Sequence, residues 1–129
     1  MQNKIRFVSI ISIIAILSII NLAPAESAKK IKPKQNIKVT FVELGSVNCM
    51  PCKMMQPVMK EIEKEYSDQV KVVFYDVWTN EGKPYANKYR INSIPTQVIL
   101  DKNGKEYYRH VGFIPKDELV RVFKIKGVK

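Results

Sequence analysis

The chain has 129 residues, which is enough for one domain and too few for two. Its 46% hydrophobic and 26% charged residues are typical of a globular protein, and its two cysteines exclude both a fold held by several disulfides and a zinc site with four thiolates. The net charge of +10 suggests an anionic partner, but much of the excess lies outside the patterned part of the sequence, which argues against a nucleic-acid binder.

Residues 1–25 have the pattern of a secretory signal peptide. A short basic start precedes an uncharged and almost wholly apolar run over residues 7–22, and small residues follow it. We expect cleavage after Ala25 and export to the periplasm or another extracytoplasmic compartment. The apolar run is slightly shorter than the roughly 20 residues of a membrane-spanning helix, so an uncleaved anchor is the alternative. Residues 26–36 are interpreted as a basic linker.

The next segment has the pattern of a strand, a helix and a second strand. Residues 37–44 alternate apolar and polar and then continue nearly apolar, which predicts a strand that enters a buried sheet. Apolar residues recur at spacings of three and four over residues 51–66, which predicts a helix that Pro57 is expected to kink. Residues 70–77 form a β-rich run. Together they predict a βαβ unit with parallel strands.

The second half of the chain shows the patterns of a short helix, a hairpin and a final helix. These lie at residues 84–90, at 96–100 with 106–111, and from Pro115 to about Phe123. The Asn-Gly pair at residues 103–104 marks the hairpin turn. The predicted order is β-α-β-α-β-β-α, an α/β fold over residues 37–124. Residues 125–129 are interpreted as a basic, solvated tail.

Two cysteines separated by two residues lie where the first strand gives way to the helix. The free N–H groups and the dipole at a helix N-terminus favour a thiolate, and only the thiolate attacks a disulfide. We therefore expect Cys49 to be the attacking sulfur and Cys52, one turn further, to resolve the mixed disulfide. Pro51 would hold the two in register. A purely structural disulfide is the alternative, but so small a loop would add little stability.

Several segments of the chain resemble those of the thioredoxin family. They are residues 41–57 with the motif Cys49-Met50-Pro51-Cys52, the loop Ser93-Ile94-Pro95-Thr96, the Asn-Gly turn at 103–104 and the glycine that follows Val111. The resemblance spans nearly all of the predicted domain. It implies the thioredoxin fold, a central mixed sheet flanked by helices, and a thiol–disulfide oxidoreductase that acts on protein disulfides. Its only redox group would be the Cys49–Cys52 pair, without a bound cofactor.

The resemblance also implies roles for other residues. Glu43 falls where thioredoxins keep a buried acid, whose pKa burial raises, and it would take the proton of Cys52 as that thiol attacks. A strand-edge carboxylate facing solvent is the alternative for Glu43. Pro95 is expected to follow a cis peptide bond. The backbone of Ile94 would then pair with an extended segment of the substrate.

The sequence departs from thioredoxins at several places around the motif. Asn48 stands where thioredoxins carry Trp, and Gly45 replaces an aromatic residue, so partner recognition is expected to differ. Met50 adds an exposed apolar side chain to the substrate-binding surface, beside Pro51. Phe74 takes the place of a lysine near the buried acid, which leaves the acid more easily protonated.

The direction of electron flow is inferred from the residues of the motif. No histidine lies between the cysteines, and His110, the only one in the chain, is on the predicted hairpin. We therefore expect a reducing couple, nearer about −270 mV than the roughly −120 mV of a strong oxidant. Resemblance to exported reductases implies a membrane thiol electron donor, of the type used in cytochrome c biogenesis. A monomer without a nucleic-acid partner is expected.

Two other functions remain open for the cysteine pair. A Cu(I) chaperone is one, because thiolates and thioethers are soft ligands and the motif is rich in methionine at Met50, Met54, Met55 and Met59. Met55 and Met59 belong to the apolar stripe of the helix, so Met54 is the one expected off it. An oxidising protein that forms disulfides is the other. The lone Trp78 is interpreted as sheet packing.

Overall fold

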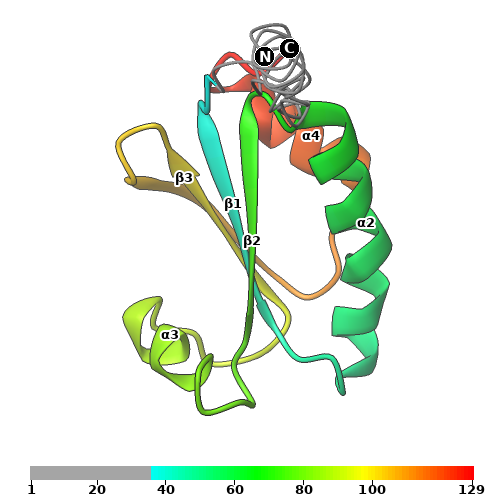
Figure 1. Ribbon diagram of the computed structural model, residues 1–129, viewed down its shortest axis with the longest axis vertical. Coiled ribbons are helices and arrows are strands. Elements are labelled where there is room, and N and C mark those ends of the chain that lie inside the picture. Colours follow the sequence, from blue (N-terminus) through cyan, green and yellow to red (C-terminus); the bar gives the residue numbers. More distant parts are fainter. Residues whose placement is uncertain (1–35) are drawn as a thin grey trace, which may run out of the picture. The chain divides into compact units, whose positions relative to one another are not determined.

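The computed structural model describes residues 36–129 (Figure 1). The predicted signal peptide and nearly all of the predicted linker lie outside the described residues. The elements follow one another in the predicted order β-α-β-α-β-β-α. They are β1 (Val39–Gly45), α2 (Met50–Tyr66), β2 (Val70–Asp76), α3 (Lys83–Lys88), β3 (Thr96–Asp101), β4 (Glu106–Val111) and α4 (Lys116–Lys124).

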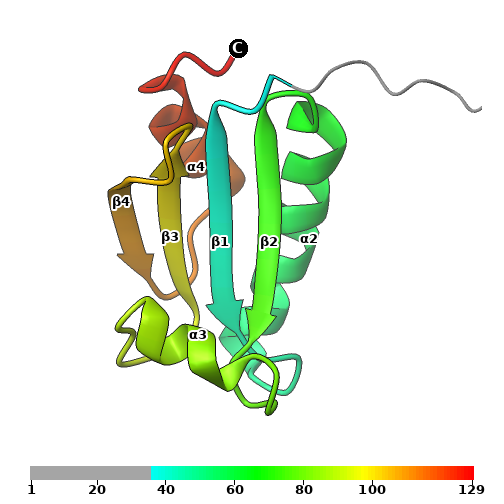
Figure 2. The ribbon, with the colours of Figure 1, turned by 60° about the vertical axis from the view of Figure 1, so that its left-hand side comes forward.

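The strands form one mixed sheet in the order β2-β1-β3-β4 (Figure 2). β1 and β2 are parallel with Gly45 opposite Asp76, whereas β3 is antiparallel to β1 with Thr96 opposite Leu44. β4 is antiparallel to β3, with Val111 opposite Thr96. One end of the sheet therefore gathers the C-terminal ends of β1, β2 and β4 and the N-terminal end of β3.

Alternate strand residues supply two apolar clusters, one on each face of the sheet. α2 and α4 cover one face and α3 covers one end of the other (Figure 1). Phe41 of β1 packs against Phe123 of α4 in the larger cluster, with ring centroids 6.0 Å apart. Leu44 of β1 belongs to the smaller cluster, beside Tyr85 of α3. This confirms the predicted mixed sheet flanked by helices.

α2 positions the cysteine motif, and its sequence explains where it begins. Cys49 is the N-cap residue in extended conformation, and Pro51 lies in the first turn, where its missing N–H costs nothing. The apolar stripe of Met55, Met59 and Ile62 is buried against the sheet. The helix runs through the exposed Pro57 to Tyr66 without interruption.

The structure differs from prediction after α3 and after α4. α3 ends at Lys88 rather than at residue 90, because Arg90 adopts φ 52°, a left-handed conformation that a helix excludes. Residues 125–129 are not a solvated tail, because Val128 is 3% exposed within the larger core cluster and Lys129 exchanges hydrogen bonds with the Gln69 side chain. Burial of one valine holds this lysine-rich segment against the fold.

In the part of the chain from residue 36 onward, none of the helices combines the length and apolar character needed to cross a membrane.

Candidate active site

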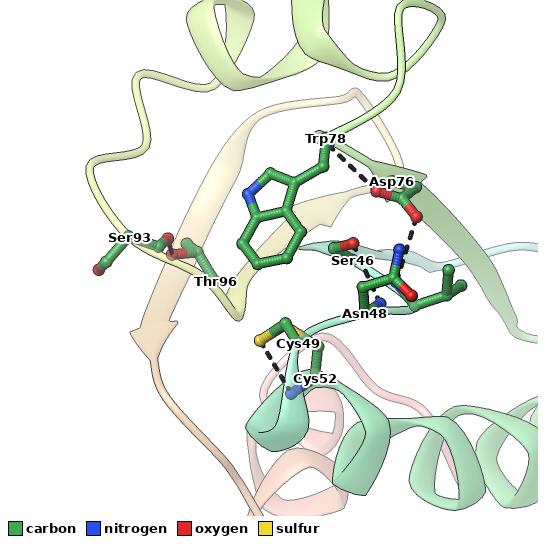
Figure 3. The surroundings of a disulfide bond; sticks show 9 residues. Ser46, Asn48, Cys49, Cys52, Asp76, Trp78, Ser93 and Thr96 are labelled. Atoms are coloured by element: carbon green, nitrogen blue, oxygen red, sulfur yellow. Dashed lines mark hydrogen bonds between the residues drawn. A yellow bond between two sulfur atoms is a disulfide. The ribbon is translucent and has the colours of Figure 1, made fainter.

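Cys49 and Cys52 form a disulfide at the N-terminus of α2 (Figure 3). Their Cα atoms are 5.2 Å apart, and the Cys49 sulfur accepts a hydrogen bond from the backbone N–H of Cys52 at 3.4 Å. The Cys49 carbonyl accepts from the N–H of Lys53 at 3.0 Å, which closes the first helical turn. The first sulfur therefore accepts a hydrogen bond from a backbone N–H at the start of the helix, where a thiolate would be stabilised.

The two cysteines differ in access to solvent. Cys49 is 8% exposed and Cys52 is 1% exposed, so the first is the more accessible to an incoming disulfide. The dipeptide between them, Met50 and Pro51, is exposed. This asymmetry agrees with the order of attack expected from the sequence.

Glu43 lies on the same face of β1 as Gly45, beneath α2, and is fully buried. Burial raises its pKa from 4.5 to about 8, although the side chain of Gln97, opposite on β3, acts to lower it. Within residues 36–129 neither carboxyl oxygen has a hydrogen-bond partner of good geometry. The solvent-facing alternative for Glu43 is therefore wrong, and the group is largely protonated at neutral pH.

Gly45 provides the contact between β1 and the second cysteine. A Cβ atom at this position would lie 3.3 Å from the Sγ of Cys52 and 3.4 Å from the ring of Phe74. Phe74 pairs with Glu43 across β1 and β2, so an apolar ring stands beside the acid. A glycine in a buried strand often marks the close approach of another group. Gly45 is therefore the feature of the sequence that could have predicted this contact.

The loop before β3 reaches the same end of the sheet. The Ile94–Pro95 peptide bond is cis, and Pro95 is buried with its carbonyl accepting from Gly112 N–H at 2.8 Å. The hydroxyl of Thr96 donates to the Ser93 carbonyl at 2.7 Å. Within the described residues the half-buried Ile94 takes part in no backbone hydrogen bond. Its N–H and carbonyl are thus open to a partner.

Asp76 and Trp78 were not predicted as part of this site. Asp76 ends β2 opposite Gly45, and its carboxylate accepts hydrogen bonds from the backbone N–H groups of Val47 and Trp78, each at 3.1 Å. Trp78 is 63% exposed, so its interpretation as sheet packing is wrong. Its side chain lies beyond the end of the strand, where the sheet offers no surface to cover it.

The methionines divide as expected from the helical stripe. Met55 and Met59 are buried, whereas Met50 and Met54 are 70% and 54% exposed near the cysteines. Among residues 36–129 no three His, Cys, Asp or Glu side chains gather in a way that would hold a metal ion.

Comparison with known proteins gives consistent results. A family model described as a thioredoxin-like domain matches residues 24–125. The thioredoxin of Bacillus subtilis (strain 168) is 44% identical over 81 residues, which cover 63% of this chain and 75% of that protein. Thioredoxin 1 of Synechococcus elongatus is 48% identical over 79 residues, which cover 61% and 71%.

Solved structures show the same likeness. A thioredoxin from Nicotiana alata superposes with a TM-score of 0.59 at 34% identity, over 72% of this chain and 76% of that one. A mutant thioredoxin from Halobacterium salinarum NRC-1 superposes with a TM-score of 0.62, over 74% and 79%. At 23% identity the second match bears on the fold alone.

Proposed function

The chain belongs to the thioredoxin-like family and is a thiol–disulfide oxidoreductase, and we propose that it works as a reductant. It acts on protein disulfides through a Cys-x-x-Cys pair. The asymmetry of the pair carries the proposed order of attack, and the absence of histidine from the motif carries the proposed direction. Cys49 is the more exposed sulfur and caps a helix, while Cys52 is buried above an acid with a raised pKa. No bound cofactor is needed, because the two thiols carry both electrons.

The proposed reaction has two steps that balance. The Cys49 thiolate attacks one sulfur of the client disulfide, forms a mixed disulfide with it and releases the other client sulfur as a thiolate, which takes a proton. Cys52 then loses its proton and attacks the Cys49 sulfur. This forms the Cys49–Cys52 disulfide and releases the second client thiolate. Two electrons pass from the protein to the client.

Glu43 is proposed to receive the proton that Cys52 loses, in the minority of molecules in which a pKa of about 8 leaves the group ionised at neutral pH. Its pKa of about 8 is close to that of an ordinary thiol, so a proton passes between the two groups with little free-energy difference. The close packing of Cys52 on Gly45, two residues along the same strand face, supports this pairing. When the disulfide is reduced again, protonated Glu43 would return the proton to the Cys52 sulfur.

Client binding is proposed to use the surface around the first sulfur. The unpaired backbone groups of Ile94, before the buried Pro95, would pair with an extended client segment. Met50 and Pro51 are exposed beside Cys49 and would contact the client chain on the other side.

We propose that the reductant is exported and receives its electrons from a membrane thiol protein. The signal-like pattern at residues 1–25 supports export, and the absence of histidine from the cysteine motif supports a reducing couple. Disulfides of apocytochrome c or of other envelope proteins fit such a reductant. A monomer is proposed as the working form.

Trapping tests the order of attack. Cys52→Ser should accumulate client proteins as mixed disulfides, because the resolving thiol is absent, whereas Cys49→Ser should retain none. Accumulation on Cys49→Ser instead would reverse the assignment. Equilibration with glutathione or dithiothreitol buffers tests the direction, and a potential above about −150 mV would indicate an oxidase.

Fractionation of cells that express the full chain tests export. The protein should appear outside the cytoplasmic membrane with an N-terminus at residue 26. Recovery of the intact chain with the membrane would favour the anchor at residues 7–22, and recovery in the cytoplasm would refute export.

Copper handling is the second candidate, and the exposure of Met50 and Met54 beside the cysteines favours it. Anaerobic titration of the reduced protein with Cu(I), against a strong competing chelator, separates the two. A reductase should lose the metal to the competitor, whereas a chaperone should retain a stoichiometric amount.

A further inference from the structure

Exposed apolar side chains gather at the end of the sheet that carries the disulfide. The large exposed apolar residues within residues 36–129 are Val47, Met50, Met54, Trp78, Val111, Phe113 and Ile125. All but Ile125 lie on segments that leave this end of the sheet or on the first turns of α2. Single exposed apolar residues are normal on a protein surface, but their grouping marks an interaction site.

Trp78 is the largest side chain of this group and stands in the loop that follows β2. It is 63% exposed, and Figure 3 shows its indole directed toward Cys49. Asn48, next to the cysteine, offers no aromatic surface of its own. Trp78 therefore supplies, from the loop after β2, the aromatic surface that the cysteine loop lacks.

The loop that carries Trp78 is held in a defined position. The Asp76 carboxylate binds the N–H of Trp78 with one oxygen and the N–H of Val47 with the other, so it joins the tryptophan loop to the cysteine loop. Desolvation raises the pKa of Asp76, but these two hydrogen bonds and one from Ser46 outweigh it and lower the pKa. The bridge is thus ionised and intact at neutral pH.

Gly82 allows the loop to fold closely against the end of β2. The Asp76 carbonyl accepts hydrogen bonds from the hydroxyl of Thr79 at 2.8 Å and from its N–H at 3.1 Å. A Cβ atom at Gly82 would lie 1.8 Å from the same carbonyl oxygen, so no other residue fits here without moving the chain. These hydrogen bonds order the backbone that carries Trp78 before a client binds, which lowers the entropic cost of binding.

We propose that Trp78 determines client specificity by packing against a large apolar side chain next to the reactive cysteine of the client. The occupant is an extended segment of an oxidised protein, because the surface is continuous with Cys49 and with the open backbone of Ile94. The inference deepens the proposed function and rests on it. Tryptophan is among the residue types that most often dominate the binding energy of an interface.

Two disulfide-linked peptide dimers test the proposal, one with Phe and one with Ser beside the cysteine. The reduced wild-type protein should reduce the Phe dimer about tenfold faster than the Ser dimer. Trp78→Ala should lose this preference while it reduces the Ser dimer and a small aliphatic disulfide at the wild-type rate. Trp78→Phe should keep most of the preference. Ile125→Ala, exposed at the far end of the fold, is the matched control and should behave as wild type.

Two outcomes would overturn the proposal: a preference that survives in Trp78→Ala, or an equal loss of rate toward all three disulfides. Failure of the wild-type protein to reduce either dimer contradicts the reductant assignment instead. In that case the rates at which the oxidised protein oxidises the reduced Phe and Ser peptides are compared. A preference for the Phe peptide that Trp78→Ala loses would support the role of Trp78, and one that survives would refute it.

Fluorescence gives a readout that is independent of rate, because Trp78 is the only tryptophan in the chain. Stable mixed disulfides can be formed between the Cys52→Ser variant and each peptide. The adduct with the Phe peptide should emit at shorter wavelength than the adduct with the Ser peptide, because the indole leaves water only in the first. Identical emission from the two adducts would refute the contact.

Discussion

At the scale of single residues, Glu43 makes the stability of the protein depend on pH. In the oxidised fold its pKa is about 8, whereas the unfolded chain ionises this group near 4.5. Between these values the unfolded chain binds fewer protons than the folded one, so the free energy of unfolding falls as pH rises. The contribution is fully present below pH 4.5 and is lost by about pH 8. Its upper limit is about 5 kcal/mol.

Glu43→Gln should remove this dependence, because the amide keeps the shape of the side chain and does not titrate. Urea unfolding of the oxidised protein between pH 5 and pH 8 should show a flatter profile for the variant than for wild type. Glu63→Gln, on the exposed side of α2, is the matched control and should keep the wild-type slope. An unchanged slope in Glu43→Gln would contradict the assignment of the raised pKa.

Gly45→Ala tests the contact between β1 and Cys52. The added methyl would stand 3.3 Å from the cysteine Sγ, so the helix N-terminus or the Phe74 ring must shift. Overpacking of this kind costs about 1–3 kcal/mol. Urea unfolding should show the larger loss in the oxidised form, where the disulfide restricts the movement of Cys52. Equal stability of variant and wild type in both forms would mean that this end of α2 is free to move.

At the scale of elements, the Asp76 carboxylate couples the segments that follow β1 and β2. In Asp76→Asn only one side-chain oxygen remains to accept, so the N–H of Val47 or of Trp78 must lose its partner. We expect faster hydrogen exchange at one of these amides and a loss of about 1 kcal/mol in stability. Acid should have the same effect, because the bridge needs an ionised Asp76 and is lost as pH falls through its lowered pKa.

Asp68→Asn is the matched control for this prediction, since Asp68 is exposed just beyond the far end of α2. Both amides should exchange at the wild-type rate in that variant. If both also keep their protection in Asp76→Asn, the two loops are ordered by their own turns and the carboxylate is dispensable.

The elements themselves could be predicted because their patterns are local. The period of two before Gly45 and the period of three to four after Pro51 depend only on which face is buried. The end of α3 could not be predicted, because Arg90 takes its left-handed conformation in a segment without glycine. The packing of Val128 could not be predicted either, since it depends on a core that the surrounding lysines do not reveal.

At the scale of the whole molecule, the site was predictable where it lies within one segment and not where it joins several. Cys49, Cys52 and the helix that they begin are contiguous, and the resemblance added Glu43 and Pro95. The bridge from Asp76 to Val47 depends on the register that sets Gly45 opposite Asp76. A register between strands separated by a helix is a property of the folded sheet, so the sequence did not reveal the position of Trp78.

The proposed direction of electron flow makes a prediction about the whole fold. A protein whose couple is more reducing than that of its own unfolded chain must be more stable when oxidised than when reduced, since folding and oxidation form one thermodynamic cycle in which 30 mV corresponds to about 1.4 kcal/mol. Within residues 36–129 no basic side chain is hydrogen-bonded to either sulfur, so α2 alone supports a thiolate in the reduced fold. The reduced form thus gains little compensation for the lost disulfide.

Urea unfolding with and without dithiothreitol should therefore give a lower midpoint for the reduced protein, with both transitions two-state. A variant with alanine at Cys49 and Cys52 should show one midpoint in both buffers, which excludes an effect of the reagent. The stability difference should match the gap between the potential of the folded protein, measured against glutathione, and that of its unfolded chain. A reduced form more stable than the oxidised one would contradict the proposed direction, because the folded couple would then be more oxidising than that of the unfolded chain, as in proteins that donate their disulfide to a client dithiol.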